Sequence, residues 1–154
     1  MRKTHQADAG LYPINQPILS SGLVTTSSGN GRSSQRKKLG AWGEKVAAIQ
    51  LEADGYRIIA RNWRCQQGEI DLIVQANDEL LVFVEVKTRR GRSMGLPEEA
   101  LTPHKSRKLI QLAQLYLSEN DLDVDWRIDL VAVELDKNGK LLRCEHIPNA
   151  VLGW

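Results

Sequence analysis

The chain has little of what several common kinds of site and location require. Its 154 residues include two cysteines, and neither lies near a second Cys or a His at the spacing of zinc ligands, so we expect reduced thiols and no zinc. No apolar run is long enough to span a bilayer, and Pro13, Asn15, Gln16 and Pro17 interrupt the stretch that a secretory signal would need. We therefore expect a cytoplasmic protein without a membrane partner.

Two familiar enzyme signatures are also missing. The three histidines lie far from any motif serine, so no hydrolase triad is indicated, and no phosphate-cradling glycine loop or dinucleotide fingerprint occurs. With 42% hydrophobic and 26% charged residues, the composition fits one α/β domain that can bury a real core.

Positive charge is concentrated near the N-terminus. Residues 1–38 hold six basic residues and one acid, although the whole chain has a formal net charge of only +2. The segment from Ser20 to Ser34 is almost entirely Ser, Thr, Gly and Asn, a composition that cannot offset the entropy cost of ordering. The sequence predicts a disordered basic tail over 1–38 and a folded domain over 39–154.

Periodicity and turn residues predict seven elements in the order α-β-β-β-α-β-β. Gly55 should end the first helix, Thr102 and Pro103 should cap the second, and Asn138-Gly139 is a turn signal. The expected ranges are a helix at 39–54, strands at 56–63, 70–76 and 80–86, a helix from 102 to about 118, and strands at 128–135 and 141–147.

The second and third strands should form a hairpin that carries acids at its open end. A turn centred on Asp78 pairs Ile73 with Phe83 and Asp71 with Glu85. Facing carboxylates cost roughly 0.2–1 kcal/mol, a penalty that a bound cation removes. Hard oxygen ligands of this kind suit Mg²⁺, with Mn²⁺ as a substitute. The other hairpin face is apolar and should be core: Ile70, Leu72, Val74, Val82, Val84 and Val86.

Three more charged residues belong to this hypothesis. Glu44 leads a helical stripe with Ala47, Ala48 and Leu51, so it should face the sheet, although such an acid taken alone is more often an ordinary first-turn residue that complements the helix dipole. Lys87 shares the face of Glu85 and could orient an attacking water and offset phosphate charge. Glu69, expected opposite Lys87, is either a fourth acid near the metal or the partner of that lysine.

Basic residues near these acids predict contacts with a phosphate backbone, with a merely solubilising surface as the alternative. Cations in the first turns of a helix oppose its dipole and so favour an outside anion. The candidates are Arg89, Arg90, Lys105, Arg107 and Lys108. Arg127 and Asp129 could pair structurally or line the edge of the site, and Trp42, Trp63 and Trp126 are expected in the core or at its rim.

Several motifs together resemble the YraN family of bacterial proteins over residues 39–135. They are Gly40-x-x-Gly43-Glu44, Asn62-Trp63-Arg64, Gly68 to Ile73, Val82 to Arg89, Pro97 to Ala100, Lys105 and Arg127-x-Asp129.

That family is similar to archaeal Holliday junction resolvases and to the PD-(D/E)xK, restriction-endonuclease-like superfamily. The resemblance implies a mixed sheet flanked by helices, with Asp71, Glu85 and Lys87 at the signature positions and Glu44 as the helical acid. It further implies metal held by Asp71 and Glu85, with the Val86 carbonyl nearby, and a possible homodimer.

The sequence thus predicts a Mg²⁺-dependent nuclease that hydrolyses phosphodiester bonds in DNA, with branched or otherwise structured DNA as the candidate substrate. Glu44, Asp71, Glu85 and Lys87 are the expected catalytic residues, and the three acids are the expected metal ligands. One alternative is a nucleic-acid-binding protein that keeps this fold without turnover. Another is a structural interaction domain whose charged residues form surface ion pairs.

Overall fold

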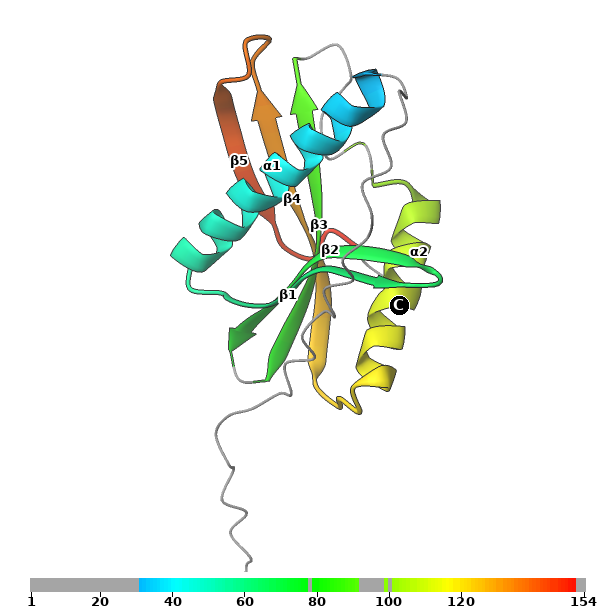
Figure 1. Cartoon of the computed structure of the whole chain (residues 1–154). Coiled ribbons are helices and arrows are strands. Elements are labelled where there is room, and N and C mark those ends of the chain that lie inside the picture. The colour runs from blue at the N-terminus through cyan, green and yellow to red at the C-terminus, as the bar shows by residue number, and fades with distance from the viewer. Residues whose placement is uncertain (1–30, 78, 92–98, 100, 152–154) are drawn as a thin grey trace, which may run out of the picture.

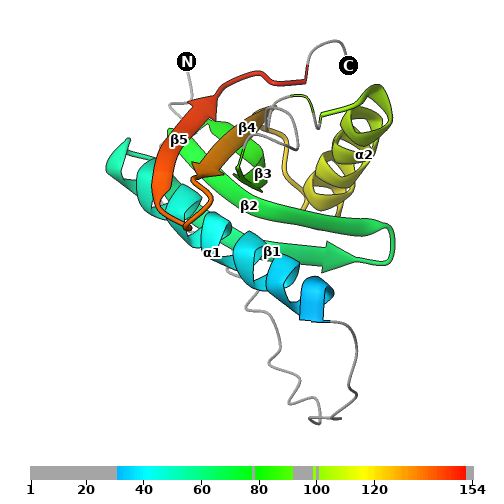
Figure 2. The same ribbon diagram turned by 90° about the horizontal axis from the view of Figure 1, so that it is seen from above.

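The structure, a computed structural model, is a five-stranded sheet with one helix on each face (Figures 1 and 2). It describes residues 31–77, 79–91, 99 and 101–151. The elements are α1 (Gly31–Ala53), β1 (Arg57–Cys65), β2 (Gly68–Asn77), β3 (Leu80–Arg90), α2 (Pro103–Glu119), β4 (Asp125–Leu135) and β5 (Leu141–Ile147). The predicted α/β class and the order α-β-β-β-α-β-β are confirmed.

The strands lie in the order β1-β2-β3-β4-β5. β3 and β4 are parallel, and the other neighbours are antiparallel. The parallel pair requires a crossover, which α2 supplies by running back along one face of the sheet (Figure 2). This crossover brings the first turn of α2 close to the middle of β3.

Each face of the sheet has its own apolar cluster. On the α1 face, small helical residues pack on valines of the central strands: Ala47, Ala48, Leu51, Val74, Val82, Val84, Val131 and Val133. On the α2 face, larger side chains interlock, and they include Ile73, Phe83, Leu109, Leu112, Tyr116 and Ile128. Trp63 stacks edge-on against Tyr116 and Trp126 against Phe83, so both tryptophans serve the core, as predicted.

The helix α1 begins earlier than the sequence predicts. It starts at Gly31, so the prediction of a disordered tail is wrong for residues 31–38, whereas residues 1–30 lie outside the described residues. Helix formation is cooperative, and Gln35, Arg36, Lys37 and Lys38 are good helix formers that extend the packed segment backward.

The stripe of Ala47, Ala48 and Leu51, which the sequence predicts to face the sheet, is the buried side of α1. Ala47, Ala48 and Leu51 are fully buried, whereas Trp42 and Ile49 are exposed. Small residues let the helix lie close to the sheet, and the closest approach is at Gly43. A Cβ atom there would lie 1.8 Å from Thr88 Oγ1 on β3, so only glycine fits.

The β2–β3 hairpin has the predicted register near its turn, with Ile73 opposite Phe83. Its open end differs from the prediction, because β2 before Leu72 pairs with β1, whereas β3 beyond Val84 continues along β4. Ile70 was expected beside Leu72 on one face, but it packs in the α2-side cluster instead. The two strands therefore separate where the predicted acids lie.

The second helix begins as predicted. Thr102 Oγ1 accepts a hydrogen bond from the Lys105 backbone N–H at 3.3 Å, and Pro103 occupies the first helical turn. Neither α1 nor α2 is long and apolar enough to cross a membrane, and these are the helices of the described part of the chain.

Candidate functional site

Asp71 lies in the gap that opens between β2 and β3. Its Oδ2 accepts a hydrogen bond from the Val86 backbone N–H at 2.7 Å. If β2 and β3 stayed paired here, a backbone carbonyl of β2 would accept the hydrogen bond from β3. Because the strands have separated, the Asp71 carboxylate accepts it instead. The bond fixes one oxygen of Asp71 against β3, next to Glu85.

The surroundings of Asp71 disfavour its negative charge. Burial is the largest effect, and the nearby carboxylates of Glu85 and Glu44 add to it, so that the pKa of Asp71 rises to about 7. The Val86 N–H and the ammonium of Lys105 act in the opposite direction but do not compensate. Glu44 and Glu85 are therefore close enough to act on Asp71, although the three predicted acids come from α1, β2 and β3.

The three acids do not form a preassembled cage. Within the described residues, no group of three or more His, Cys, Asp or Glu side chains is arranged closely enough to hold a metal ion. Glu85 is only 9% exposed, and its Oε1 forms an ion pair with Lys105 Nζ at 3.2 Å. The Lys105 ammonium thus neutralises one oxygen of the Glu85 carboxylate.

Lys105 therefore has a different place from the one the sequence indicated. It was expected to grip phosphates from the surface of α2, yet its ammonium contacts an acid of the site. This contact could have been predicted from the crossover connection. Because β3 and β4 are parallel neighbours, the helix that joins them must run back across the sheet close to β3.

Glu44 lines an open groove of about 970 Å³ between the first half of α1 and the far end of the β1–β2 hairpin. The groove also contains Lys37, Asn62, Arg64, Gln67 and Glu69. Lys108 reaches the same end of the hairpin, because its Cε would lie 3.6 Å from a Cβ at Gly68.

The predicted pairing of Glu69 with Lys87 is wrong. Glu69 lies opposite Arg64 of β1, and Arg64 Nε forms an ion pair with Glu69 Oε2 at 3.1 Å. The cause is the separation of β2 from β3, which leaves this end of β2 paired with β1.

Lys87 is half-buried and lines a second groove, of about 400 Å³, between α1 and the end of β3. It follows Glu85 by two residues in the same strand and so shares its face. Arg89 and Arg90 line this groove as well. Arg90 also donates hydrogen bonds from Nε (3.2 Å) and Nη2 (2.9 Å) to the Lys137 carbonyl, while Arg107 is exposed on α2.

The pair Arg127 and Asp129 belongs to a structural network. Asp129 is fully buried and accepts hydrogen bonds from Arg127 Nε at 2.9 Å, His146 Nε2 at 2.7 Å and the Asn149 N–H at 2.9 Å. Burial alone would raise the pKa of Asp129, but these bonds outweigh it and hold the pKa below its usual value. Arg127 Nη2 also donates to Tyr56 Oη at 3.0 Å, so the network joins β4, β5 and the segment before β1.

Comparison with known proteins identifies the family. The model of the uncharacterised protein family UPF0102 matches residues 43–133, the part of the chain that contains every acid of the site. A UPF0102 protein of Symbiobacterium thermophilum is 52% identical over 115 residues, covering 74% of this chain and 96% of the relative. A UPF0102 protein of Roseiflexus castenholzii is 45% identical over 119 residues, covering 76% and 95%. The chain therefore belongs to the UPF0102 family, the YraN family that its motifs indicated.

Proposed function

We propose that this protein is a metal-dependent nuclease that hydrolyses phosphodiester bonds in DNA. The observation that carries the proposal is the environment of Asp71, a carboxylate set between two diverging strands and pushed toward its protonated form by burial, Glu85 and Glu44. A purely structural strand pair has no reason to gather like charges at this depth.

The donor set fits a hard divalent cation. Asp71, Glu85 and Glu44 supply carboxylate oxygens, the donors that Mg²⁺ and Mn²⁺ prefer over the nitrogen and sulfur that favour zinc. The acids of the described residues would have to draw together around the ion, because as they stand no three of them are close enough to hold it. These residues would hold Mg²⁺ or Mn²⁺, and such an ion supplies polarisation of a phosphodiester and a more acidic water.

The other residues of the site have roles that follow from their position. Lys87, on the face of Glu85, offsets charge on the phosphate and orients water. Lys105 neutralises Glu85 while no cation is present, which lowers the cost of burying that carboxylate. Arg89 and Arg90 at the end of β3, and Arg107 and Lys108 on α2, are the candidate phosphate contacts.

A cleavage panel tests the proposal. Branched, flapped, single-stranded and duplex DNA are incubated with Mg²⁺ or Mn²⁺ and with the wild type, Lys87→Ala or Lys45→Ala. Lys45 is exposed on α1 and provides the matched loss of one lysine. We expect cleavage by the wild type and Lys45→Ala but a loss of about 100-fold or more in Lys87→Ala. Equal cutting by all three proteins would point to a contaminant and remove the assignment.

A non-catalytic nucleic-acid-binding protein with the same fold is the second candidate. The ion pair between Lys105 and Glu85 favours it, because one acid already has a partner. This alternative predicts DNA affinity that falls steeply with salt, survives Asp71→Ala and brings no cleavage with either metal. Calorimetric titration with Mn²⁺ distinguishes the nuclease and the non-catalytic DNA-binding protein from a structural interaction domain, which would bind neither metal nor DNA.

A homodimer acting on branched DNA, the arrangement implied by the resemblance to resolvases, is part of the first proposal. Sedimentation equilibrium with and without a four-way junction tests it. A monomer under both conditions would remove the homodimer from the proposal and leave the nuclease assignment to the cleavage panel.

A further inference from the structure

The first turns of α1 and the end of β3 enclose a strongly basic groove, which we call the α1–β3 groove. It consists of two adjoining hollows, of about 400 and 220 Å³, that share Arg36, Leu39 and Arg90. Five basic residues line it: Arg32, Arg36, Lys87, Arg89 and Arg90. Among the described residues that line the two hollows there is no acid.

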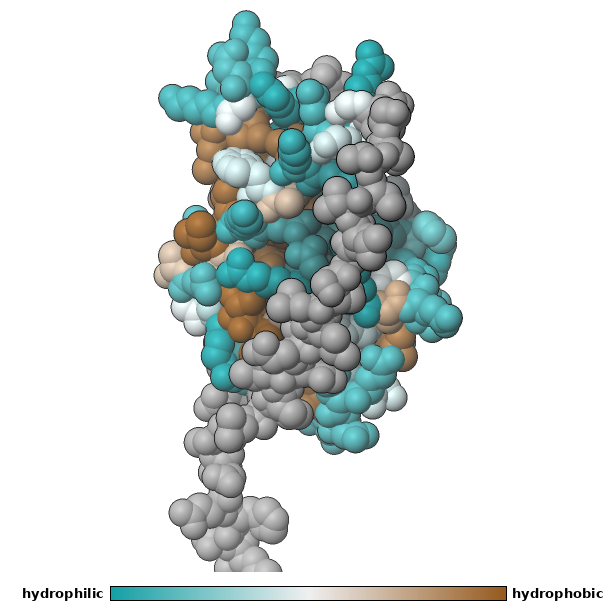
Figure 3. Space-filling view, viewed as in Figure 1, coloured by the Kyte–Doolittle hydropathy of each residue, from teal (hydrophilic) through white to brown (hydrophobic). Residues whose placement is uncertain are grey.

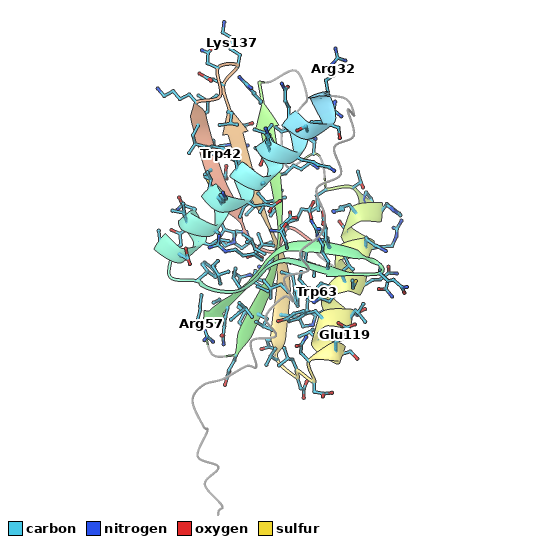
Figure 4. All side chains as sticks on the ribbon, in the orientation of Figure 1. Arg32, Trp42, Arg57, Trp63, Glu119 and Lys137 are labelled. Atoms are coloured by element: carbon cyan, nitrogen blue, oxygen red, sulfur yellow. The ribbon has the colours of Figure 1, made fainter. Side chains whose placement is uncertain are left out.

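The smaller hollow depends on the early start of α1, because Arg32, Gln35 and Arg36 line it. Residues 31–38 place Arg32 and Arg36 one helical turn apart, roughly 6 Å along the helix axis. Figure 4 shows Arg32 at the same end of the molecule as Lys137, to whose carbonyl Arg90 is bonded. Hydrophilic side chains gather at this end in the space-filling view (Figure 3).

Two buried polar atoms beside the groove lack a partner. Thr88 Oγ1 and Arg89 Nε have no hydrogen-bond partner in the part of the chain that the structure describes. Both residues line the larger hollow. Leaving a buried donor unpaired costs about 1–3 kcal/mol. Thr88 Oγ1 packs against Gly43 of α1, so Arg89 Nε is the donor that a ligand in the larger hollow would pair, by a shift of the arginine side chain.

The charge balance of α1 points to the same kind of ligand. The first turn of the helix contains no acid, and it carries Arg32, which opposes the positive end of the helix dipole. Cationic side chains that crowd this end, together with the unpaired Nε of Arg89 on β3, are stabilised by an anion with several acceptor oxygens. The phosphodiester backbone of a nucleic acid has this chemistry, with charges repeated along its length.

We propose that the α1–β3 groove binds the phosphate backbone of the substrate strand next to the acidic site. This inference rests on the proposed function and names the surface that holds the substrate. Lys87 lines the groove and lies two residues from Glu85 in β3. The bound DNA strand therefore passes from the acidic site over Lys87 into the groove. Arg36 and Arg32 then contact successive phosphates.

The test measures DNA binding without cleavage. Labelled single-stranded and duplex oligonucleotides are titrated in EDTA at several salt concentrations, with fluorescence anisotropy as the readout. For the double variant Arg32→Ala/Arg36→Ala, we expect the slope of log Kobs against log salt to become shallower by about 1.4 for single strands and 1.8 for duplex. Lys38→Ala is the control, because Lys38 is exposed on the same helix and lines neither hollow.

The outcomes separate this inference from the nuclease proposal. If the slope for the double variant equals that of the wild type, or if Lys38→Ala changes it as much, the groove does not bind phosphates, whatever the cleavage panel shows. If the double variant has the shallower slope and no DNA is cut by the wild type, the groove stands and the catalytic assignment fails. Circular dichroism confirms that each variant is folded.

Discussion

Replacing Asp71 by Asn should make the protein more stable at neutral and alkaline pH. The amide keeps the size of the side chain and an oxygen that can accept from the Val86 N–H, but it carries no charge. The pKa of the carboxyl rises from 3.8 to about 7 on folding, chiefly through burial. The folded protein therefore binds this proton more tightly than the unfolded chain does.

The magnitude follows from linkage. The shift from 3.8 to about 7, at 1.36 kcal/mol for each pH unit, gives a ceiling of about 4 kcal/mol. The free energy of unfolding of the wild type falls as pH rises from about 4 to about 7, because in this range the folded state holds more protons. Above pH 7 the penalty is constant, and below pH 4 it is absent.

Urea denaturation of the wild type and Asp71→Asn at pH 4.5 and pH 8 measures the effect. We expect the variant to be more stable by up to about 4 kcal/mol at pH 8 but by no more than about 1 kcal/mol at pH 4.5, where most of the penalty has not yet developed. Asp123→Asn is the control, since Asp123 is an exposed acid, and it should change little at either pH. Mg²⁺ should stabilise the wild type more than the variant, because the ion would bind the carboxylate.

The reasoning is refuted if Asp71→Asn is less stable than the wild type at pH 8. It is equally refuted if the difference between the two proteins is the same at both pH values. Either result would mean that the charge of Asp71 is not penalised by its surroundings.

Three further predictions follow from other contacts. Lys105→Met should tighten Mn²⁺ binding by up to about fivefold in calorimetry, because the ion would no longer compete with the Lys105 ammonium for the carboxylate of Glu85. Unchanged binding, or the same gain in the exposed control Arg107→Met, would contradict this prediction. Asp129→Ala should lower the free energy of unfolding by about 3–5 kcal/mol, since it leaves Arg127 without its buried partner. Because the pKa of Asp129 is lowered in the folded protein, the stabilisation by this carboxylate should be complete above about pH 4 and lost as pH falls. Equal stability of the variant and the wild type at pH 7 would refute the network. Gly43→Ala should destabilise the folded protein by about 1–3 kcal/mol, because the added Cβ clashes with Thr88. Gly40→Ala on the same helix should stabilise it by about 0.5–1 kcal/mol, since no atom lies within 4 Å of the added Cβ. Similar shifts in melting temperature for the two variants would argue against the close approach of α1 to β3 at Gly43.

Local signals were sufficient for most of the elements. The cap at Thr102 and Pro103, the alternation in β2 and β3, and the register that pairs Ile73 with Phe83 are properties of neighbouring residues or of a tight hairpin. Such features are decided by short-range sterics and hydrogen bonds, which a sequence displays directly.

The start of α1 could not be predicted from composition alone. Residues 31–34 continue the Ser- and Gly-rich composition before them, and the good helix formers at 35–38 were grouped with that segment, yet all eight belong to a helix whose later turns are packed against the sheet. Cooperative extension from a packed helix overrides weak local preference, and this is why Arg32 and Arg36 were missed as part of a groove.

The sequence by itself determined which acids and lysine stand near the end of one hairpin, because hairpin register depends on residue spacing. Only the tertiary structure decided that β2 and β3 separate there, that Glu69 turns to Arg64, and that Lys105 reaches Glu85. These contacts join segments far apart in the chain. They depend on where α2 crosses the sheet and on which strand keeps β2 as its partner, and no local pattern encodes either.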